Sequence, residues 1–123
     1  MDTRHAASQL RQEIRRLLER RNRLEDEFLR PVRMMAASLI ERHLGTSDEK
    51  RASSAFYLSG VAEGKTKLIH VPKPDLEKVQ EEVKAWRTYR AALRQWSEAT
   101  REIGRLLKRL GAAQARRPGE EES

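Results

Sequence analysis

The chain opens with hydrophobic residues at helical spacing. Over residues 6–30 these positions follow one another at steps of four, three, seven and four, within a background of Arg, Glu, Gln and Asn: Leu10, Ile14, Leu17, Leu24 and Phe28. This spacing is typical of the a/d seam of a coiled coil and predicts a helix. Arg21 stands at the step where the seam should carry a hydrophobic residue. Pro31 ends the predicted helix near Leu29, because proline has no backbone N–H to donate.

A second and longer helix is predicted over residues 75–110. Two interleaved series recur every seven residues, offset by three: Val79, Trp86, Leu93, Thr100 and Leu107, and Tyr89, Trp96, Ile103 and Leu110. They predict a seam that packs against the first helix. Asp75 suits the N-cap and Gly111 the C-terminal cap. Because this helix is the longer one, a sheet, a second copy or a partner must cover the rest of its seam.

Between the helices the pattern changes to that of strands. Residues 32–44 fit both a helical face and an alternating strand, and we favour a short helical turn followed by a strand over 39–44. The polar residues 45–54 predict a mobile loop. Aromatic and β-branched residues predict two further strands around residues 56–58 and 68–71, joined by a hairpin loop over 60–65. Pro72 and Pro74 end this small β region of residues 38–72.

These elements predict an α+β fold that is mainly α. The architecture is a long antiparallel helical hairpin, like a coiled coil, with a small inserted β-hairpin or three-stranded sheet. Length favours a single domain over residues 1–113, and the composition of residues 114–123 favours a disordered tail.

The overall charge favours anionic partners. The chain has 123 residues, with 26 Lys and Arg against 19 Asp and Glu, a net charge of +7 and a sequence pI near 10.2. Such a balance favours nucleic acid first and anionic membrane second, and the alternative is a charged helical surface with a basic bias. No cysteine is present, which excludes disulfides, thiolate nucleophiles and cysteine-ligated metal sites. With no membrane-length apolar run and no apolar leader, we expect a cytoplasmic protein without a membrane partner.

The candidate catalytic and cofactor motifs are weak. Gly64-Lys65-Thr66 resembles the end of a phosphate-binding loop, but three residues separate Gly60 from Gly64 where four are needed, and a strand follows instead of a helix. His43 and His70 could share a metal, yet no third ligand has suitable spacing. No Ser/His/Asp arrangement or pair of buried carboxylates stands out. We therefore predict no enzyme activity, no metal and no cofactor.

The basic residues predict two groups of phosphate contacts. Lys65, Lys67 and Lys73 gather around the sheet, whereas an antiparallel hairpin brings together a second group at its far end: Arg15, Arg16, Arg105, Lys108 and Arg109. The alternative is neutralisation by carboxylates at helical spacing, such as Glu13, Glu19, Glu98 and Glu102. Trp86, Tyr89 and Trp96 could stack on bases, but their seam spacing favours the core.

Several short motifs resemble those of a known group of proteins. They are Ser38-Leu39-Ile40-Glu41-Arg42, Phe56-Tyr57-Leu58, Gly64-Lys65-Thr66, Val71-Pro72-Lys73, Glu82-Val83-Lys84-Ala85-Trp86 and Tyr89-Arg90. In this order they resemble an uncharacterised family of small bacterial and archaeal proteins, a domain of unknown function, over residues 36–108. The resemblance implies a helical hairpin carrying a small sheet and an association with mobile elements or phages. Family members carry cysteines after the first strand, arranged like a small metal site, and this chain has none there.

Two functional hypotheses follow. The leading one is a non-enzymatic nucleic-acid-binding accessory protein, directed at DNA and acting beside a recombinase, a transposase or a similar machine. The alternative is a coiled-coil interaction or oligomerisation subunit, which would form a homodimer or dock onto a larger protein. Its predicted partner-binding residues are Trp96, Ile103, Leu107 and Leu110.

Overall fold

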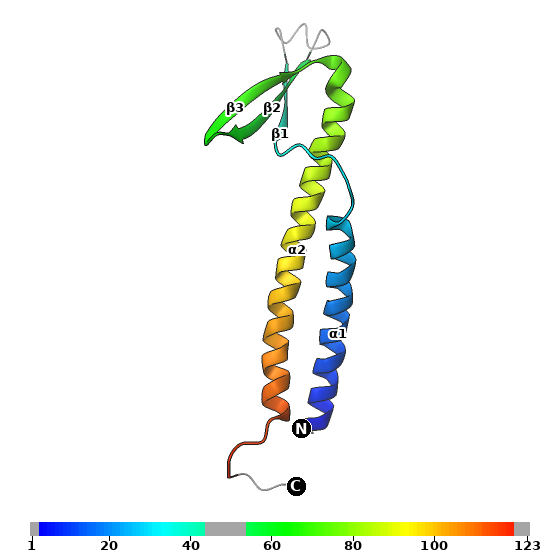
Figure 1. Ribbon diagram of the computed structural model, residues 1–123, viewed down its shortest axis with the longest axis vertical. Helices are drawn as coiled ribbons and strands as arrows, with labels where there is room; N and C mark the ends of the chain where they lie inside the picture. Colours follow the sequence, from blue (N-terminus) through cyan, green and yellow to red (C-terminus); the bar gives the residue numbers. More distant parts are fainter. Residues whose placement is uncertain (1–2, 44–53, 120–123) are drawn as a thin grey trace. The chain divides into compact units, whose positions relative to one another are not determined.

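The computed structural model describes residues 3–43 and 54–119. In chain order the elements are α1 (Thr3–Phe28), β1 (Ser38–His43), β2 (Ser54–Ala62), β3 (Lys65–Val71), a short 3-10 turn η2 (Lys73–Asp75) and α2 (Leu76–Gln114) (Figure 1). Two long helices pack together and a three-stranded antiparallel sheet is inserted between them, which confirms the predicted fold class. The chain forms two compact units, a helical unit (Met1–Arg30 with Ala91–Ser123) and a sheet unit (Pro31–Arg90).

The helical unit has a coiled-coil-like core between α1 and the C-terminal part of α2. Ile14, Ile103 and Leu106 are buried, and three half-buried leucines pack around them: Leu10, Leu17 and Leu110. The predicted seam of α1 is confirmed, since each of its residues is buried or half-buried. Arg21 lies within this seam, and its Nη1 atom donates a hydrogen bond of 3.4 Å to Oγ1 of Thr100.

The seam of α2 differs in part from the prediction. The series through Trp96, Ile103 and Leu110 faces α1, as expected. The companion series, however, consists of Ala92, Ala99, Leu106 and Ala113, whereas Leu93 and Leu107 are exposed. Three of the four companion residues are alanines, which bury little area and therefore carry a weak hydrophobic signal. The prediction placed the seam on the larger side chains one position further along the helix.

The C-terminal end of α2 also corrects a prediction. The helix continues through Gly111 to Gln114, and the backbone N–H of Ala115 still donates to the carbonyl of Gly111 at 2.9 Å. Gly111 is therefore an interior helix residue and does not cap the helix. Alanine and glutamine are strong helix formers, and Ala113 continues the seam, so both propensity and packing favour the additional turn.

The sheet unit is built on the N-terminal part of α2. Its strands lie in the order β1-β2-β3, and one face of the sheet packs against the helix. Leu58, Val71 and Val83 form the buried core there, surrounded by partly buried apolar side chains: Met35, Ala37, Leu39, Phe56, Leu76 and Val79. The sheet thus covers the N-terminal part of the α2 seam. A sheet was one of the three alternatives predicted to cover it.

The segment before β1 is irregular, so the predicted helical turn after Val32 is wrong. The backbone N–H of Met35 donates to the carbonyl of Glu82 at 2.9 Å and holds the segment against α2. The segment also approaches β2 closely, because a Cβ atom on Gly60 would lie 3.2 Å from the carbonyl oxygen of Ala36. The strand itself begins at Ser38 and ends at His43. The predicted mobile loop of residues 45–54 lies outside the described residues, apart from Ser54, which begins β2.

The β2–β3 connection is tighter than predicted. The strands extend to Ala62 and from Lys65, so only Glu63 and Gly64 form the turn. Both have positive φ, 55° and 76°, which is typical of a type I′ hairpin turn. Gly64-Lys65-Thr66 therefore belongs to a hairpin, as the sequence predicted, and not to a strand–loop–helix phosphate site.

Candidate nucleic-acid interface

The predicted basic residues of the two helix ends lie together in the helical unit. Arg11 Nη1 donates to Gln114 Oε1 at 2.5 Å, and Leu10 and Leu110 belong to one apolar cluster. The N-terminal part of α1 therefore lies beside the C-terminal part of α2. We call the cationic side chains gathered there the basic end: Arg4, Arg11, Arg15, Arg16, Arg105, Lys108, Arg109, Arg116 and Arg117. All nine are exposed to solvent.

Carboxylates neutralise only part of this charge. Residues 4–16 and 102–119 contain two, Glu13 and Glu102. Glu13 forms an ion pair with Arg16, and the hydrogen bond raises the pKa of Arg16. Glu102 accepts from Arg105 Nε at 2.9 Å, which lowers the pKa of Glu102 and raises that of Arg105. Within the described residues of these two ranges, nine cations stand against two carboxylates, and the adjoining sequence adds Asp2, Glu19 and Glu120–Glu122. Carboxylates at helical spacing therefore neutralise part of the charge, and a positive excess remains.

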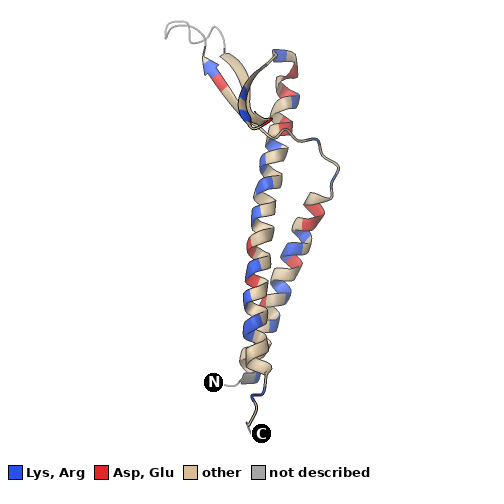
Figure 2. Ribbon diagram, turned by 60° about the vertical axis from the view of Figure 1, so that its left-hand side comes forward, with Lys and Arg blue, Asp and Glu red and all other residues tan. Residues whose placement is uncertain are grey.

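Four of the five basic residues of α2 within the helical unit follow one face of the helix, and Arg109 lies outside it. Arg94, Arg101, Arg105 and Lys108 each come two positions after a seam residue, which places them about 200° around the helix from the seam. They therefore point away from α1. Figure 2 shows Lys and Arg positions repeated along α2, whereas acidic positions gather at the C-terminal end of α1.

Helix stability does not explain how charge is distributed along α1. Its first turn has no acidic residue and its last turn no basic one, and Glu25, Asp26 and Glu27 stand at the C-terminal end. A helix dipole favours the opposite arrangement, by typically 0.3–1 kcal/mol for each well-placed charge. In addition, Arg11 and Arg15 lie beside a helix end that is itself basic. Within the basic end, Arg4 in the first turn opposes the dipole of α1, whereas the cations near the C-terminal end of α2 lie at the end that a helix dipole favours.

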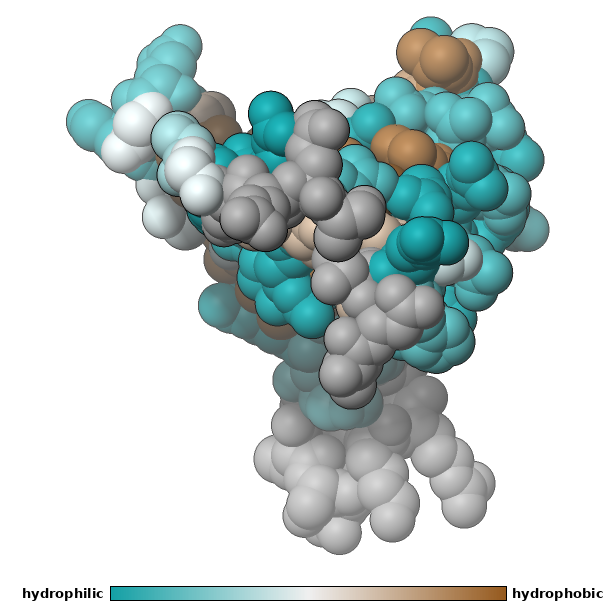
Figure 3. Space-filling view, turned by 90° about the horizontal axis from the view of Figure 1, so that it is seen from below, coloured by the Kyte–Doolittle hydropathy of each residue, from teal (hydrophilic) through white to brown (hydrophobic). Residues whose placement is uncertain are grey.

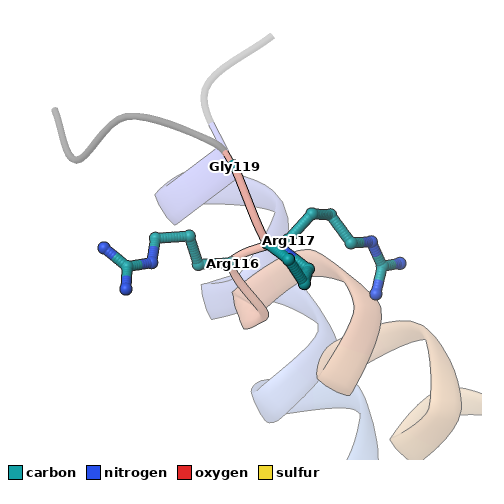
Figure 4. Close-up of a pocket in the computed structure, with 4 residues that line it drawn as sticks. Arg116, Arg117 and Gly119 are labelled. Atoms are coloured by element: carbon teal, nitrogen blue, oxygen red, sulfur yellow. The ribbon is translucent and has the colours of Figure 1, made fainter.

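The C-terminal arginines do not form an enclosed anion pocket. Arg116, Arg117, Pro118 and Gly119 line a shallow hollow, but the two arginine side chains point to opposite sides of it (Figure 4). Seen from the side of the chain ends, most of the visible surface is hydrophilic, with a few hydrophobic patches (Figure 3). The nine basic side chains are exposed and the hollow at residues 116–119 is not enclosed, so the basic end suits contact with an extended polyanion better than capture of a small ligand.

The predicted lysines of the sheet lie in the other compact unit. Lys65 and Lys67 are exposed on β3, two residues apart and therefore on the same face, and Lys73 lies in the 3-10 turn that follows. Because β3 is an edge strand, exposed lysines there also discourage pairing with other chains. Lys65, Lys67 and Lys73 belong to the sheet unit, whereas the basic end belongs to the helical unit.

His43 and His70, which were considered from the sequence but not predicted as a metal pair, lie on different strands. His43 Nδ1 lies 3.2 Å from Ser54 Oγ, whereas His70 stands directly opposite Tyr57 in the strand register. The register places His43 and His70 on opposite faces of the sheet. Within residues 3–43 and 54–119, no group of three His, Asp or Glu side chains could hold a metal.

The predicted stacking aromatics occupy helix positions. Trp86 and Tyr89 stack at 6.4 Å between ring centroids with an interplanar angle of 7°, and the guanidinium of Arg90 lies 5.8 Å from the Trp86 centroid. Trp96 is half-buried in the seam, so the core interpretation holds for it. A different aromatic group, Tyr57 and His70 on neighbouring strands of the sheet, was not predicted from the sequence. Alternation along each strand could have placed its members on one face, but only the strand register brings them together.

The predicted partner-binding set divides between core and surface. Ile103 is 4% exposed, and Trp96 and Leu110 are half-buried in the helix pair, whereas Leu107 is 50% exposed. Leu107 lies seven residues before Gln114 and therefore on the same face of α2, and Leu18 lies seven residues after Arg11 on the same face of α1. Because Arg11 binds Gln114, Leu18 and Leu107 lie on the same side of the helix pair. Together with Leu93 they form what we call the apolar flank.

No described helix is both long and apolar enough to cross a lipid bilayer. Comparison of the chain with models of protein families, with curated proteins and with solved structures finds no match.

Proposed function

We propose that this protein binds nucleic acid, primarily DNA, as a non-enzymatic accessory protein, and that the basic end makes the phosphate contacts. The observation that carries the proposal is the excess of nine cations over two carboxylates among the described residues 4–16 and 102–119, at two adjacent helix ends. The Arg16–Glu13 and Arg105–Glu102 ion pairs use part of this charge within the helices, and an anionic partner would neutralise the excess.

The chemistry of the basic end favours affinity over sequence recognition. Arginine and lysine side chains contact phosphates independently of the base, which positions a protein on nucleic acid without reading it. Each neutralised phosphate releases condensed counterions, so binding weakens steeply with salt. With about six such contacts, affinity for duplex DNA should fall roughly 10³-fold between 50 and 200 mM salt.

The test is a salt titration of duplex DNA binding by fluorescence anisotropy. A variant with Lys108→Glu and Arg109→Glu should bind more weakly, and its slope of log affinity against log salt should be smaller by about two. The matched control carries Arg20→Glu and Arg23→Glu, which make the same change of net charge on exposed α1 residues outside the basic end. Equal losses in the two variants, or no duplex binding by the parent at 50 mM salt, would reject the proposal.

A second candidate function is supported by the apolar flank. Leu18, Leu93 and Leu107 are exposed on one side of a helix pair that is otherwise highly charged, and such positions suit the packing of another helix. In this version the protein is an interaction subunit. Sedimentation should then show self-association that Leu107→Glu removes and that the Lys108→Glu and Arg109→Glu variant retains. A parent that stays monomeric at high concentration would remove the homodimer form of this candidate.

The association with a recombination or transposition machine rests on the family resemblance of residues 36–108. It remains part of the proposal, and its test is co-purification with the proteins encoded by neighbouring genes.

A further inference from the structure

The outer face of the sheet carries a contiguous group of three cationic and aromatic side chains. Tyr57 on β2 stands directly opposite His70 on β3, and their rings meet edge to face with centroids 5.4 Å apart at 70°. The guanidinium carbon of Arg42 on β1 lies 5.4 Å from the centroid of the Tyr57 ring. Each of the three strands thus contributes one member.

This group lies on the face of the sheet that α2 does not cover. Side chains alternate between faces along a strand, and residues paired across strands share a face. Leu39, Phe56, Leu58 and Val71 pack towards α2, so the alternate positions form the outer face: Ser38, Ile40, Arg42, Ala55, Tyr57, Ser59, Val61, Thr66, Leu68 and His70.

The composition of the outer face favours a ligand that carries both anionic groups and planar aromatic rings. None of its ten residues is acidic, Arg42 is cationic, and four carry hydroxyl groups. Tyr57 is half-buried, whereas Arg42 and His70 are exposed. Leu68 is 45% exposed beside this group, although an isolated surface strand gains nothing from an apolar side chain there.

We infer that the outer face of the sheet binds single-stranded nucleic acid, with bases stacked on Tyr57 and His70 and a phosphate held by Arg42. This inference rests on the proposed nucleic-acid function and adds its ligand class and a second surface. Stacking on aromatic rings needs bases that are free of a duplex, since every base then presents a π-face. A three-stranded sheet also offers a flat surface on which successive nucleotides can lie side by side.

In the unbound structure the Arg42 guanidinium occupies the position over the Tyr57 ring that a base would take. Arginine stacks on aromatic rings and also binds phosphate with its fork of N–H donors. A base that takes the place over Tyr57 therefore releases Arg42 towards the phosphate of the same or the next nucleotide. The ring–cation contact holds the group in order before the ligand arrives.

The experiment uses the full chain and labelled oligonucleotides of about 15 residues, oligo(dT) and oligo(rU), each with a central 2-aminopurine. Tyr57→Leu should weaken single-strand binding about tenfold and abolish the fluorescence change of the 2-aminopurine, because one stacked base is lost. Tyr57→Phe retains the ring and should bind like the parent. The relative affinity for the two oligonucleotides shows whether DNA or RNA is the preferred single strand.

Arg42→Gln provides a second variant that leaves the aromatic pair in place, with Arg33→Gln as its control on an exposed arginine of the same unit. Arg42→Gln should weaken single-strand binding several-fold and Arg33→Gln should not. The inference is overturned if Tyr57→Leu binds single strands as well as the parent does, if Tyr57→Phe loses as much as Tyr57→Leu, or if the two arginine variants behave alike.

Duplex binding separates this inference from the proposed function. Tyr57→Leu should leave the affinity for duplex DNA unchanged, whereas Lys108→Glu with Arg109→Glu should lower it. Loss of duplex binding in the charge variant together with unaltered single-strand binding in Tyr57→Leu would remove the stacking surface and retain the basic end. The reverse pattern would remove the basic end and retain the stacking surface.

Discussion

Ile103 and Leu107 provide a direct test of the helix register. They lie four residues apart on α2, and the sequence predicted both as partner-binding residues. Ile103 is 4% exposed and packs with Ile14 and Leu106, whereas Leu107 is 50% exposed. Replacing each in turn by alanine therefore removes a similar volume from the core in one variant and from the surface in the other.

The expected magnitudes differ about threefold. Ile103→Ala removes three carbon atoms from a buried site, which costs about 2.4 kcal/mol at roughly 0.8 kcal/mol for each buried carbon. The cavity that remains adds to this loss, so we expect about 3 kcal/mol. Leu107→Ala exposes no cavity, because solvent fills the space, and about half of the side chain is already in water. Its cost should stay below about 1 kcal/mol.

Urea unfolding followed by circular dichroism at 222 nm measures both values at low protein concentration. The same experiment at high concentration tests the apolar flank, since a loss in Leu107→Ala that grows with concentration would come from association and not from the single chain. If Leu107→Ala costs as much as Ile103→Ala in dilute solution, the register is wrong and α2 is turned by one position.

Three further predictions follow from individual residues. Gly60→Ala should destabilise the protein by about 1–2 kcal/mol, because its Cβ would lie 3.2 Å from Ala36 O and Ala37 Cβ. Gly104→Ala has open space around its Cβ and should stabilise α2 by about 1 kcal/mol. Urea unfolding that ranks the two variants in the opposite order would contradict the packing. Glu63→Asn should stabilise the β2–β3 turn by about 0.5–1 kcal/mol in thermal unfolding, because Asn tolerates the positive φ of 55°, and a loss of stability would argue against this turn. Because Arg105 lowers the pKa of Glu102, their ion pair stabilises the folded state above the ordinary glutamate pKa of about 4.3 and is lost as the pH falls through the lowered value. Acid titration should therefore destabilise the parent protein more than the Glu102→Gln variant, and identical acid unfolding profiles would refute a stabilising ion pair. The same variant should bind DNA more tightly at pH 7, because it lacks one carboxylate of the basic end.

The sequence predicted the two long helices, the strands and their order, but not the irregular segment before β1 or the last turn of α2. The seven-residue pattern of Leu10 to Phe28 depends on large side chains, whose burial dominates helix pairing, and it survived in the structure. The α2 seam was misplaced where alanines fill it, because Ala92 and Ala99 are buried but carry little hydrophobic signal. The backbone contact of Met35 with Glu82 has no sequence signature at all, so the segment before β1 could not be predicted.

The candidate sites likewise divide into one that the sequence predicted and one that it could not. The basic end followed from antiparallel pairing alone, since that pairing brings Arg15 and Arg105 to one end whatever the exact register. The outer face of the sheet did not, because the contacts of Tyr57 with Arg42 and His70 depend on which residues stand opposite each other in three strands. A shift of one residue in either strand pair would send these side chains to opposite faces.

The charge of α1, which opposes its own helix dipole, has a consequence for motion. An excess of like charge disfavours a compact state, so the last turns of the helix pair, which carry this excess, should open more often than the centre around Ile14 and Ile103 because of repulsion. An anion that neutralises the arginines removes the repulsion and closes the same turns. Ligand binding and ordering of the helix ends would then be a single event, and backbone amides near Arg11 and Lys108 would exchange their hydrogens more slowly when nucleic acid is bound.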